Sequence, residues 1–323
     1  MGKNQRFIFC AGGIFVSYFY FGILQEKITR GNYPYTSVDE SGLVKNINEK
    51  FTFALSLVFI QCLINYLFAK GMLIAKPQPE DTTPTKYFAS ASLTYLLAMI
   101  CSNMALQWVP YPTQVVGKSA KPIPVMILGV LIGRKSYALR KYLFVLLIVI
   151  GVVLFMYKDK SGKVQTGGSS IGIGELLLIL SLVMDGLTGA VQERMRAESK
   201  PSAQQMMMAM NFWSTVFVTF TLLLTGETFE FFNFVTRHPS VILNMSLLAV
   251  TGALGQLFIF LMVSEFGPLP CSVVTTTRKF FTVLASVLIF QNPLLPRQWI
   301  GAVIVFTGLF LDAYYSKSTP KKK

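Results

Sequence analysis

The stretch VILNMSLLAVTGALGQLFIFLM, residues 241–262, contains no charged side chain. In lipid, backbone groups must find their hydrogen-bond partners inside their own segment, so an apolar run of this length predicts a transmembrane helix. About 20 residues at 1.5 Å each cross a hydrocarbon core of roughly 30 Å. Similar apolar runs recur along the rest of the chain, and none shows the alternating pattern of a membrane β-barrel.

The composition agrees with a polytopic membrane protein. Hydrophobic residues make up 53% of the 323 positions and charged residues only 14%, whereas soluble domains carry about 25% charged residues. No large soluble domain is therefore expected. The first apolar run is interpreted as a span and not as a cleaved signal peptide, because Gln25, Glu26 and Lys27 follow it. The ten predicted spans are approximately 7–24, 51–71, 87–107, 112–133, 141–157, 172–192, 205–225, 241–262, 269–290 and 296–315.

An internal repeat predicts how these helices are organised. Residues 112–157 align with 270–314, and the alignment places Lys121 on Lys279 and Gly151 on Gly308. With five helices in each half, the halves would have opposite orientations, which is the inverted-repeat plan of many transporters. We therefore predict an all-α fold of ten transmembrane helices in two inverted repeats. The expected divisions are a first repeat 1–160, a linker 161–171, a second repeat 172–316 and a basic tail 317–323.

The formal net charge of +14 resides mostly in the short connections between spans. Lys and Arg are more frequent in the connections that would be cytosolic if the N-terminus were cytosolic, so both termini are predicted to face the cytosol. The same placement argues against nucleic-acid binding.

Cysteine and histidine usage argues against metal chemistry. The four cysteines lie in separate apolar runs, and His238 is the only histidine. We therefore expect no metal site, no cofactor and no catalytic residue. The two longest connections, 25–50 and 70–86, are interpreted as mobile loops.

Two dibasic segments inside predicted spans carry the functional signal. The first, TQVVGKSAKPIP at 113–124, places Lys118 and Lys121 on one helical face. The second, TTTRKFF at 275–281, contains Arg278 and Lys279 after three threonines that include Thr277. An inverted repeat would bring the two segments together near the middle of the membrane.

The energetic cost of these cations suggests their purpose. Each Lys or Arg at a helix centre costs about 2.5–3.5 kcal/mol, so four cost on the order of 10 kcal/mol if uncompensated. Intramembrane acids are few, and Asp185 is the most central of them. We infer a positively charged, water-filled cavity that binds phosphates. The alternative is that the cations pair with the acids or extend to the membrane surface.

Several neighbouring residues are weaker substrate-binding candidates. Tyr20, Gln25 and Glu26 could line the mouth of the cavity, or they could form an ordinary interfacial belt with loop charges. Tyr111 and Gln114 lie close to Lys118 in sequence and have a better case. Thr277 joins them because it precedes the second dibasic pair.

Asp185 has two interpretations at this stage. It either holds a cavity lysine or bonds between helices, and the structural role is preferred.

With these segments in view, the chain resembles the nucleotide-sugar transporters of solute carrier family 35, in the drug/metabolite transporter superfamily. It is most similar to the endoplasmic-reticulum branch of subfamily B. The stretches that carry the resemblance are YFYFGILQEKITRG at 18–31, FTFALSLVFIQ at 51–61, YPTQVVGKSAKPIPVM at 111–126, MDGLTG at 184–189 and FGPLPCSVVTTTRKFF at 266–281.

The resemblance implies a ten-helix carrier that works by alternating access. It implies substrate phosphates on Lys118, Lys121, Arg278 and Lys279, and transport either of UDP-galactose or UDP-glucose or of ATP in exchange for ADP. It also implies residence in the endoplasmic reticulum, with the Golgi as the alternative, because the C-terminal lysines at 321–323 form only a degenerate dilysine signal.

We therefore expect an antiporter in the lipid bilayer, with a nucleotide or nucleotide sugar as substrate and a nucleotide as counter-substrate, and no enzyme activity. Two rivals are weighed against it. A membrane-embedded transferase would need paired loop acids such as Asp-x-Asp, which the sequence lacks. A non-transporting receptor or scaffold would have no need of intramembrane cations. The sequence leaves the base, the sugar and the oligomeric state open.

Overall fold

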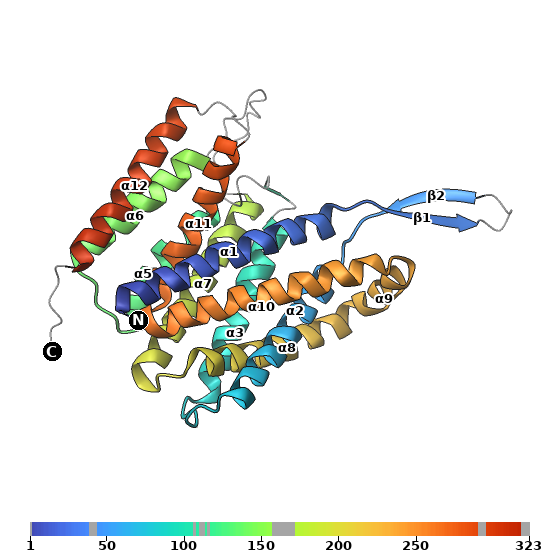
Figure 1. The fold of residues 1–323 in the computed structure, drawn as a ribbon, viewed down its shortest axis with the longest axis horizontal. Coiled ribbons are helices and arrows are strands. Elements are labelled where there is room, and N and C mark those ends of the chain that lie inside the picture. Colours follow the sequence, from blue (N-terminus) through green and yellow to red (C-terminus); the bar gives the residue numbers. More distant parts are fainter. Residues whose placement is uncertain are drawn as a thin grey trace. The chain divides into compact units, whose positions relative to one another are not determined.

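The computed structural model describes residues 2–38, 44–105, 108–109, 114, 117–156, 172–289 and 295–317, and most of them are helical (Figure 1). The helices are α1 Lys3–Arg30, α2 Ala54–Ala75, α3 Thr85–Ala105, α5 Pro122–Leu131, α6 Leu139–Met156, α7 Ile173–Glu198, α8 Ala203–Thr225, α9 Glu227–Arg237, α10 Ser240–Phe266, α11 Pro268–Ile289 and α12 Pro296–Lys317. The strands are β1 Tyr33–Val38 and β2 Val44–Glu49.

Among the residues that the structure describes, six helices are long and apolar enough to cross a membrane: α1, α2, α3, α7, α8 and α10. Each overlaps a span predicted from the sequence, which confirms a predominantly helical, multi-pass architecture. The helices α5, α6, α11 and α12 overlap the other four predicted spans. The count of ten spans and the inverted arrangement stay predictions.

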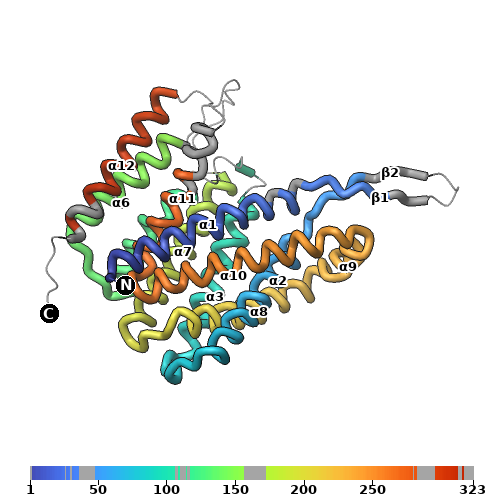
Figure 2. Tube along the Cα trace, viewed as in Figure 1, coloured from blue at the N-terminus to red at the C-terminus, as the bar shows by residue number. Residues whose placement is uncertain are grey.

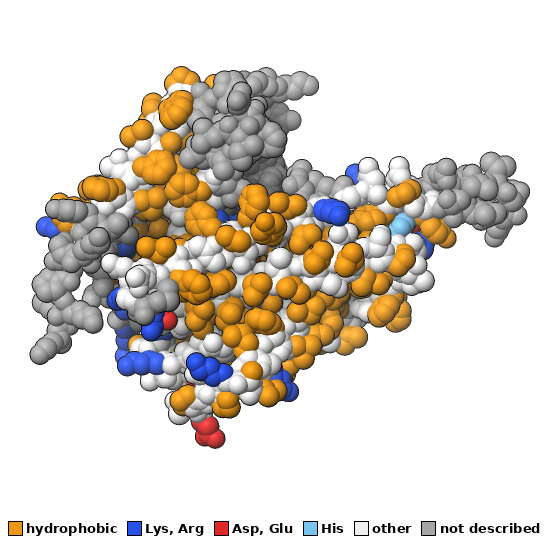
Figure 3. Space-filling model, in the orientation of Figure 1, with side chains coloured by type: hydrophobic (Ala, Val, Ile, Leu, Met, Phe, Trp, Pro, Cys, Tyr) orange, Lys and Arg blue, Asp and Glu red, His pale blue; other side chains and the backbone are white. Residues whose placement is uncertain are grey.

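Large hydrophobic side chains are exposed along these helices, as lipid-facing surfaces require. On α10, Leu243, Leu247, Val250 and Leu254 are 40–66% exposed. Figure 3 shows hydrophobic side chains over much of the face that it draws. In a bilayer such a surface is in contact with acyl chains instead of water.

The described chain forms two compact units that do not coincide with the predicted repeats. The first comprises residues 1–82 and 201–264, and the second comprises 83–200 and 265–323. Each unit thus takes helices from both predicted halves of the sequence. The repeat boundaries themselves stay predictions.

In the first unit, α1, α2, α8, α9 and α10 pack with the hairpin of β1 and β2. Glycine permits a close approach of α1 to α10, because a Cβ at Gly255 would lie 2.8 Å from the Tyr18 ring. Between helices, the side chain of Asn211 accepts a hydrogen bond from Asn65 (3.4 Å) and donates one to Gln256 (2.7 Å). These amides join α2, α8 and α10 within the apolar surroundings.

The hairpin lies in the connection that was expected to be a mobile loop. β1 and β2 pair antiparallel, with Tyr33 opposite Glu49. α1 also continues to Arg30, six residues beyond its predicted end, because no glycine or proline occurs between Leu24 and Gly31. The Tyr33 ring packs edge-on against Phe234 at 5.2 Å, and its burial raises the pKa of its hydroxyl. The hairpin is therefore anchored to α9.

In the second unit, α6 and α12 lie side by side (Figures 1 and 2). Glycine again sets the distance between them, since a Cβ at Gly301 would lie 2.7 Å from the Phe155 backbone nitrogen. Small residues at a helix interface let backbones approach closely in a membrane. The ring of Phe155 on α6 packs edge to face against the ring of Phe280 on α11, with the ring centroids 4.7 Å apart. α11 therefore belongs to the same hydrophobic core.

Candidate substrate-binding site

Lys118 and Lys121 lie in a tight turn that leads into α5. The amide of Ala120 donates to Gly117 O, and that of Lys121 donates to Lys118 O (3.0 and 3.3 Å), which are i to i+3 bonds typical of a 3₁₀ turn. Lys121 is the N-cap of α5, and Pro122 at its first position has no amide hydrogen to satisfy. A new helical segment, α5, thus starts at Pro122, directly after Lys121.

Both lysines converge on one carboxylate. Lys118 Nζ lies 2.5 Å from Asp185 Oδ2, and Lys121 Nζ lies 2.8 Å from Asp185 Oδ1. Each ammonium donates a hydrogen bond to its oxygen. Asp185 thus performs both tasks considered from the sequence: it holds the lysines and it connects α7 to the segment before α5.

Ser181, one turn before Asp185 on α7, extends this network. Its Oγ accepts a hydrogen bond from Lys118 Nζ at 2.7 Å and donates one to Ala98 O of α3 at 2.5 Å. Ser181 is fully buried. The basic turn is therefore tied to α3 as well as α7. The sequence analysis missed Ser181, although its spacing of four residues from Asp185 places both on one helical face.

Small residues on α7 bring α5 close enough for these bonds. A Cβ at Gly186 would lie 2.9 Å from the backbone carbonyl of Pro124, and one at Gly189 would lie 3.0 Å from a Val125 methyl carbon. Any larger side chain at Gly186 would push α5 away. The MDGLTG segment thus positions Asp185 through the residues that follow it.

The three charged groups differ in accessibility. The Asp185 side chain is 5% exposed, Lys118 is 17% exposed and Lys121 is 34% exposed. The carboxylate therefore lies on the buried side of the ammonium groups, and Lys121 is the most open to an approaching ligand. Together the three groups carry a net charge of +1.

The second dibasic segment lies on α11 in the same unit. Arg278 is partly buried there, and the side chain of Lys279 lies outside the described residues. The hydroxyl of Thr277 donates within α11 to the carbonyls of Val273 and Val274, each at 3.0 Å. Phosphate contacts by these residues stay predictions.

The weaker candidates are placed as follows. Gln114 is buried, and its Nε2 donates to Ser102 O (2.6 Å) and Ser102 Oγ (3.1 Å), so its amide connects to α3. Tyr20 and Gln25 are exposed on α1, in the other unit. The side chain of Glu26 and all of Tyr111 lie outside the described residues. Their roles stay predictions.

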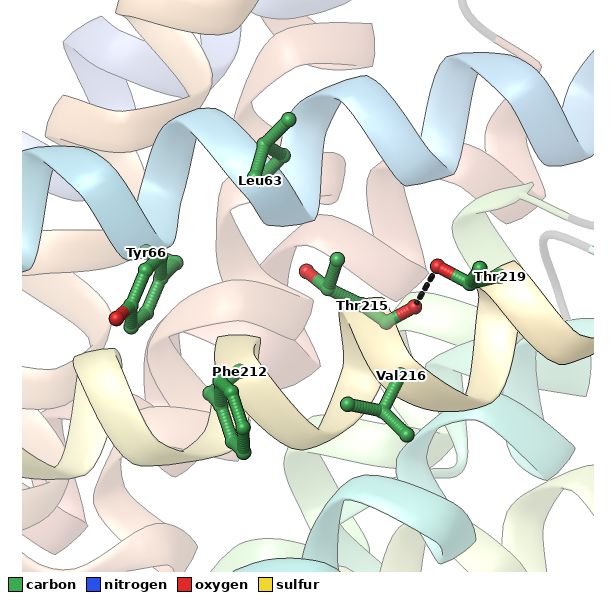
Figure 4. Close-up of a pocket in the computed structure, with 6 residues that line it drawn as sticks. All are labelled: Leu63, Tyr66, Phe212, Thr215, Val216 and Thr219. Carbon is green, nitrogen blue, oxygen red and sulfur yellow. Dashed lines mark hydrogen bonds between the residues drawn. The ribbon is translucent and has the colours of Figure 1, made fainter.

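A groove between α2 and α8 has a different character (Figure 4). It encloses about 330 Å³ and is lined by Leu63, Tyr66, Phe212, Thr215, Val216 and Thr219. The Thr219 hydroxyl donates to Thr215 O at 2.7 Å, as the dashed line in Figure 4 marks. With no charged side chain in its lining, this groove does not offer charge to a phosphate.

A second buried acid, Glu193, lies two turns after Asp185 on α7. Its carboxylate pairs with Lys135 at 3.0 Å and with Arg196 at 2.9 Å. Arg196 also donates to Glu265 O (3.2 Å), just before Gly267, whose φ of +104° only glycine readily adopts. Burial and the nearby carboxylate of Glu193 raise the pKa of Tyr137 to about 12. This cluster joins connecting segments at the end of α7.

Within the described residues, no group of three or more His, Cys, Asp or Glu side chains could hold a metal ion. The groups that the structure brings together at the site are two ammonium groups, a carboxylate and a hydroxyl.

The profile of the UAA transporter family matches residues 6–316, nearly the whole chain. The chain belongs to the UAA transporter family. This membership makes the protein a transporter in a membrane, and it places transport above both rival functions.

Relatives of this UAA-family chain carry a consistent name. A Drosophila melanogaster protein named solute carrier family 35 member B1 homolog is 60% identical over 98% of this chain and 93% of its own length. Proteins named solute carrier family 35 member B1 from Gallus gallus (54% identical, covering 99% and 95%) and Xenopus laevis (52%, covering 98% and 96%) are also similar. The predicted resemblance to this solute carrier family is confirmed.

A solved crystal structure has the same fold as this UAA-family chain, with a TM-score of 0.53. It is 11% identical in sequence and covers 97% of this chain and 99% of its own. This likeness concerns the fold alone.

Proposed function

We propose that the protein is an antiporter of nucleotides or nucleotide sugars in the endoplasmic-reticulum membrane, with both termini in the cytosol. Substrate phosphates bind Lys118 and Lys121, and Arg278 and Lys279 of α11 complete the site. The halves of the carrier then alternate access between the two sides. The candidates for substrate are UDP-galactose, UDP-glucose, or ATP exchanged for ADP.

The convergence of Lys118 and Lys121 carries this proposal. Two ammonium groups share the single carboxylate of Asp185 at a break in the helical backbone, inside a predicted span, so one positive charge is left without a carboxylate of its own. Lysine serves phosphate as a point charge, and helix breaks are where transporters bind their substrates. The names of the relatives support the same class of transporter.

Exchange follows from the cost of moving an empty basic site across the membrane. Substrate phosphates neutralise the cations, so the loaded carrier reorients with less uncompensated charge than the empty one. A second nucleotide must then bind before the carrier returns.

Transport into proteoliposomes tests the proposal. Purified protein is reconstituted, and uptake of labelled ATP and labelled UDP-galactose is measured with and without unlabelled nucleotide inside. We expect uptake of at least one of them to depend on the internal nucleotide. Equal uptake into empty and loaded vesicles would contradict exchange, and no uptake of either would contradict the substrate class.

Variants connect this transport to the site. Lys121→Ala removes the more exposed ammonium and is expected to lower the uptake rate by roughly 100-fold, the loss typical of a charged contact worth about 3 kcal/mol. Lys76→Ala is the control, because Lys76 is an exposed lysine just after α2 and its loss leaves the site intact. If uptake fell equally in Lys121→Ala and Lys76→Ala, Lys121 would have no specific role in transport.

A further inference from the structure

Asp185 is an unexpected group in a site for phosphate, because its negative charge repels the anion that the lysines attract. It is nevertheless held firmly, with both oxygens bonded by lysines and only 5% of the side chain exposed. Gly186 and Gly189 fix its helix against α5. The carboxylate is therefore built into the site by its contacts and by the packing of its helix.

Resting on the proposed function, we propose that Asp185 is an internal counter-ion, which replaces the substrate phosphate in the empty site and weakens phosphate binding in the loaded one. The empty turn carries a net charge of +1 where two unpaired lysines would carry +2. Leaving a buried charge without its partner is strongly destabilising, so the paired arrangement makes an empty site possible.

The geometry lets carboxylate and phosphate act on the same lysines from opposite sides. An ammonium has three N–H donors. Lys118 directs donors to Asp185 and to Ser181, whereas Lys121 directs one to Asp185 and is 34% exposed. An entering phosphate would therefore meet Lys121 first, with the Asp185 charge behind it.

The charge of Asp185 affects both the affinity of the site for the substrate phosphate and the rate at which the substrate is released. A carrier must bind its substrate well enough to load and weakly enough to let it leave. A fixed negative charge behind the lysines lowers the affinity for phosphate and speeds its release. Without that charge, the same lysines would hold the substrate longer, and the empty carrier would reorient more slowly because its cations would be unpaired.

The test is the dissociation constant of Asp185→Asn for ATP and for UDP-galactose, measured by equilibrium binding to purified protein. We expect binding at least roughly tenfold tighter than in the wild type, from the removal of one charge within several ångströms of the phosphate. The maximal exchange rate in proteoliposomes is expected to fall, because release becomes slower.

Glu193→Gln is the control variant. Glu193 lies on the same helix, is equally buried and also pairs with two cations, Lys135 and Arg196. If losing any buried acid changed binding, the dissociation constants of Asp185→Asn and Glu193→Gln would change alike. We expect the dissociation constants of Glu193→Gln to match those of the wild type.

A second comparison keeps the test decisive if Asp185→Asn alone fails to fold. Lys118→Gln lowers the net charge of the turn from +1 to 0. The double variant Lys118→Gln/Asp185→Asn restores the net charge of +1, and its affinity is compared with that of the single variant. The double variant is expected to bind the nucleotide at least roughly tenfold more tightly than the single one.

The outcomes separate this inference from the function on which it rests. If the wild type binds neither ATP nor UDP-galactose, the proposed function fails. If the wild type binds one of them, but removal of Asp185 leaves affinity unchanged or weaker in both comparisons, the counter-ion role is wrong and the phosphate site stands.

Discussion

Asp185 shows what a single residue contributes to this site, because its two oxygens accept hydrogen bonds from both lysines of the turn. The cations at 118 and 121 were predicted from their cost in a membrane, and Asp185 from its central position in a span. That one carboxylate would accept from both lysines depends on how α5 is rotated against α7, which packing determines. The sequence therefore predicted the charged groups and allowed Asp185 to hold one lysine, but it did not predict that Asp185 would hold both.

Ser181 yields a prediction about stability. Ser181→Ala removes a partner of Lys118 and leaves the Ala98 carbonyl without that donor. Loss of a buried hydrogen-bonding group of this kind costs about 1–3 kcal/mol. We expect a lower melting temperature of the purified protein, measured by intrinsic fluorescence.

Ser246→Ala serves as the comparison for Ser181→Ala. The Ser246 hydroxyl is exposed on α10 and donates to Ile242 O, one turn back. Its loss is expected to change the melting temperature little. If the two variants melted at the same temperature, the network through Ser181 would contribute nothing to stability.

The pairing of α6 with α12 shows how an element interface depends on glycine. Gly301→Leu would place a side chain where its first carbon lies 2.7–3.0 Å from backbone atoms of α6. Backbone cannot yield as a flexible side chain can, so the helices must separate at a cost of about 1–3 kcal/mol or more. Reduced folded yield and a lower melting temperature are the expected results.

Gly71→Ala is the corresponding control on α2, because a Cβ there meets nothing within 4 Å. Alanine favours a helix over glycine by about 1 kcal/mol, so this variant is expected to be as stable as the wild type or slightly more stable. A Gly301→Leu protein as stable as Gly71→Ala would mean that α6 and α12 do not approach as closely as described.

The hairpin gives a prediction about local order. Glu49 of β2 pairs with Arg237 at 3.0 Å and contacts His238 Nε2 at 3.0 Å, which ties the hairpin to the end of α9. Glu49→Gln is expected to speed amide hydrogen exchange in β1 and β2, residues 33–38 and 44–49, by several-fold, because a partly exposed pair is worth about 1 kcal/mol or less. Exchange in α10 is expected to stay the same, and a uniform increase along the chain would contradict a local anchor.

Hydropathy predicted where the helices lie better than where they end. The predicted spans overlap every long helix, yet α1 runs to Arg30 and α10 to Phe266, where Gly31 and Gly267 follow. Polar residues at a membrane surface can continue a helix that has left the lipid, so apolar content marks the span and glycine marks the helix end. The hairpin was missed because Gly, Asn and mixed charges in 25–50 resemble a loop.

The protein as a whole is a membrane transporter in which each of two compact units takes helices from both predicted halves of the sequence. That division follows from long-range helix packing, which a repeat alignment does not reveal. The lysine turn, Ser181 and Asp185 all lie within the second of these units.

The claim on which this account rests is that the lysine turn recognises phosphate. The direct measurement is the shift in melting temperature produced by ADP and UDP, compared with adenosine and uridine, in the wild type and in Lys121→Gln. We predict that at least one of the two nucleotides stabilises the wild type, that its nucleoside does not, and that Lys121→Gln loses most of the difference. Equal stabilisation by nucleotide and nucleoside, or a full nucleotide shift in Lys121→Gln, would contradict the account.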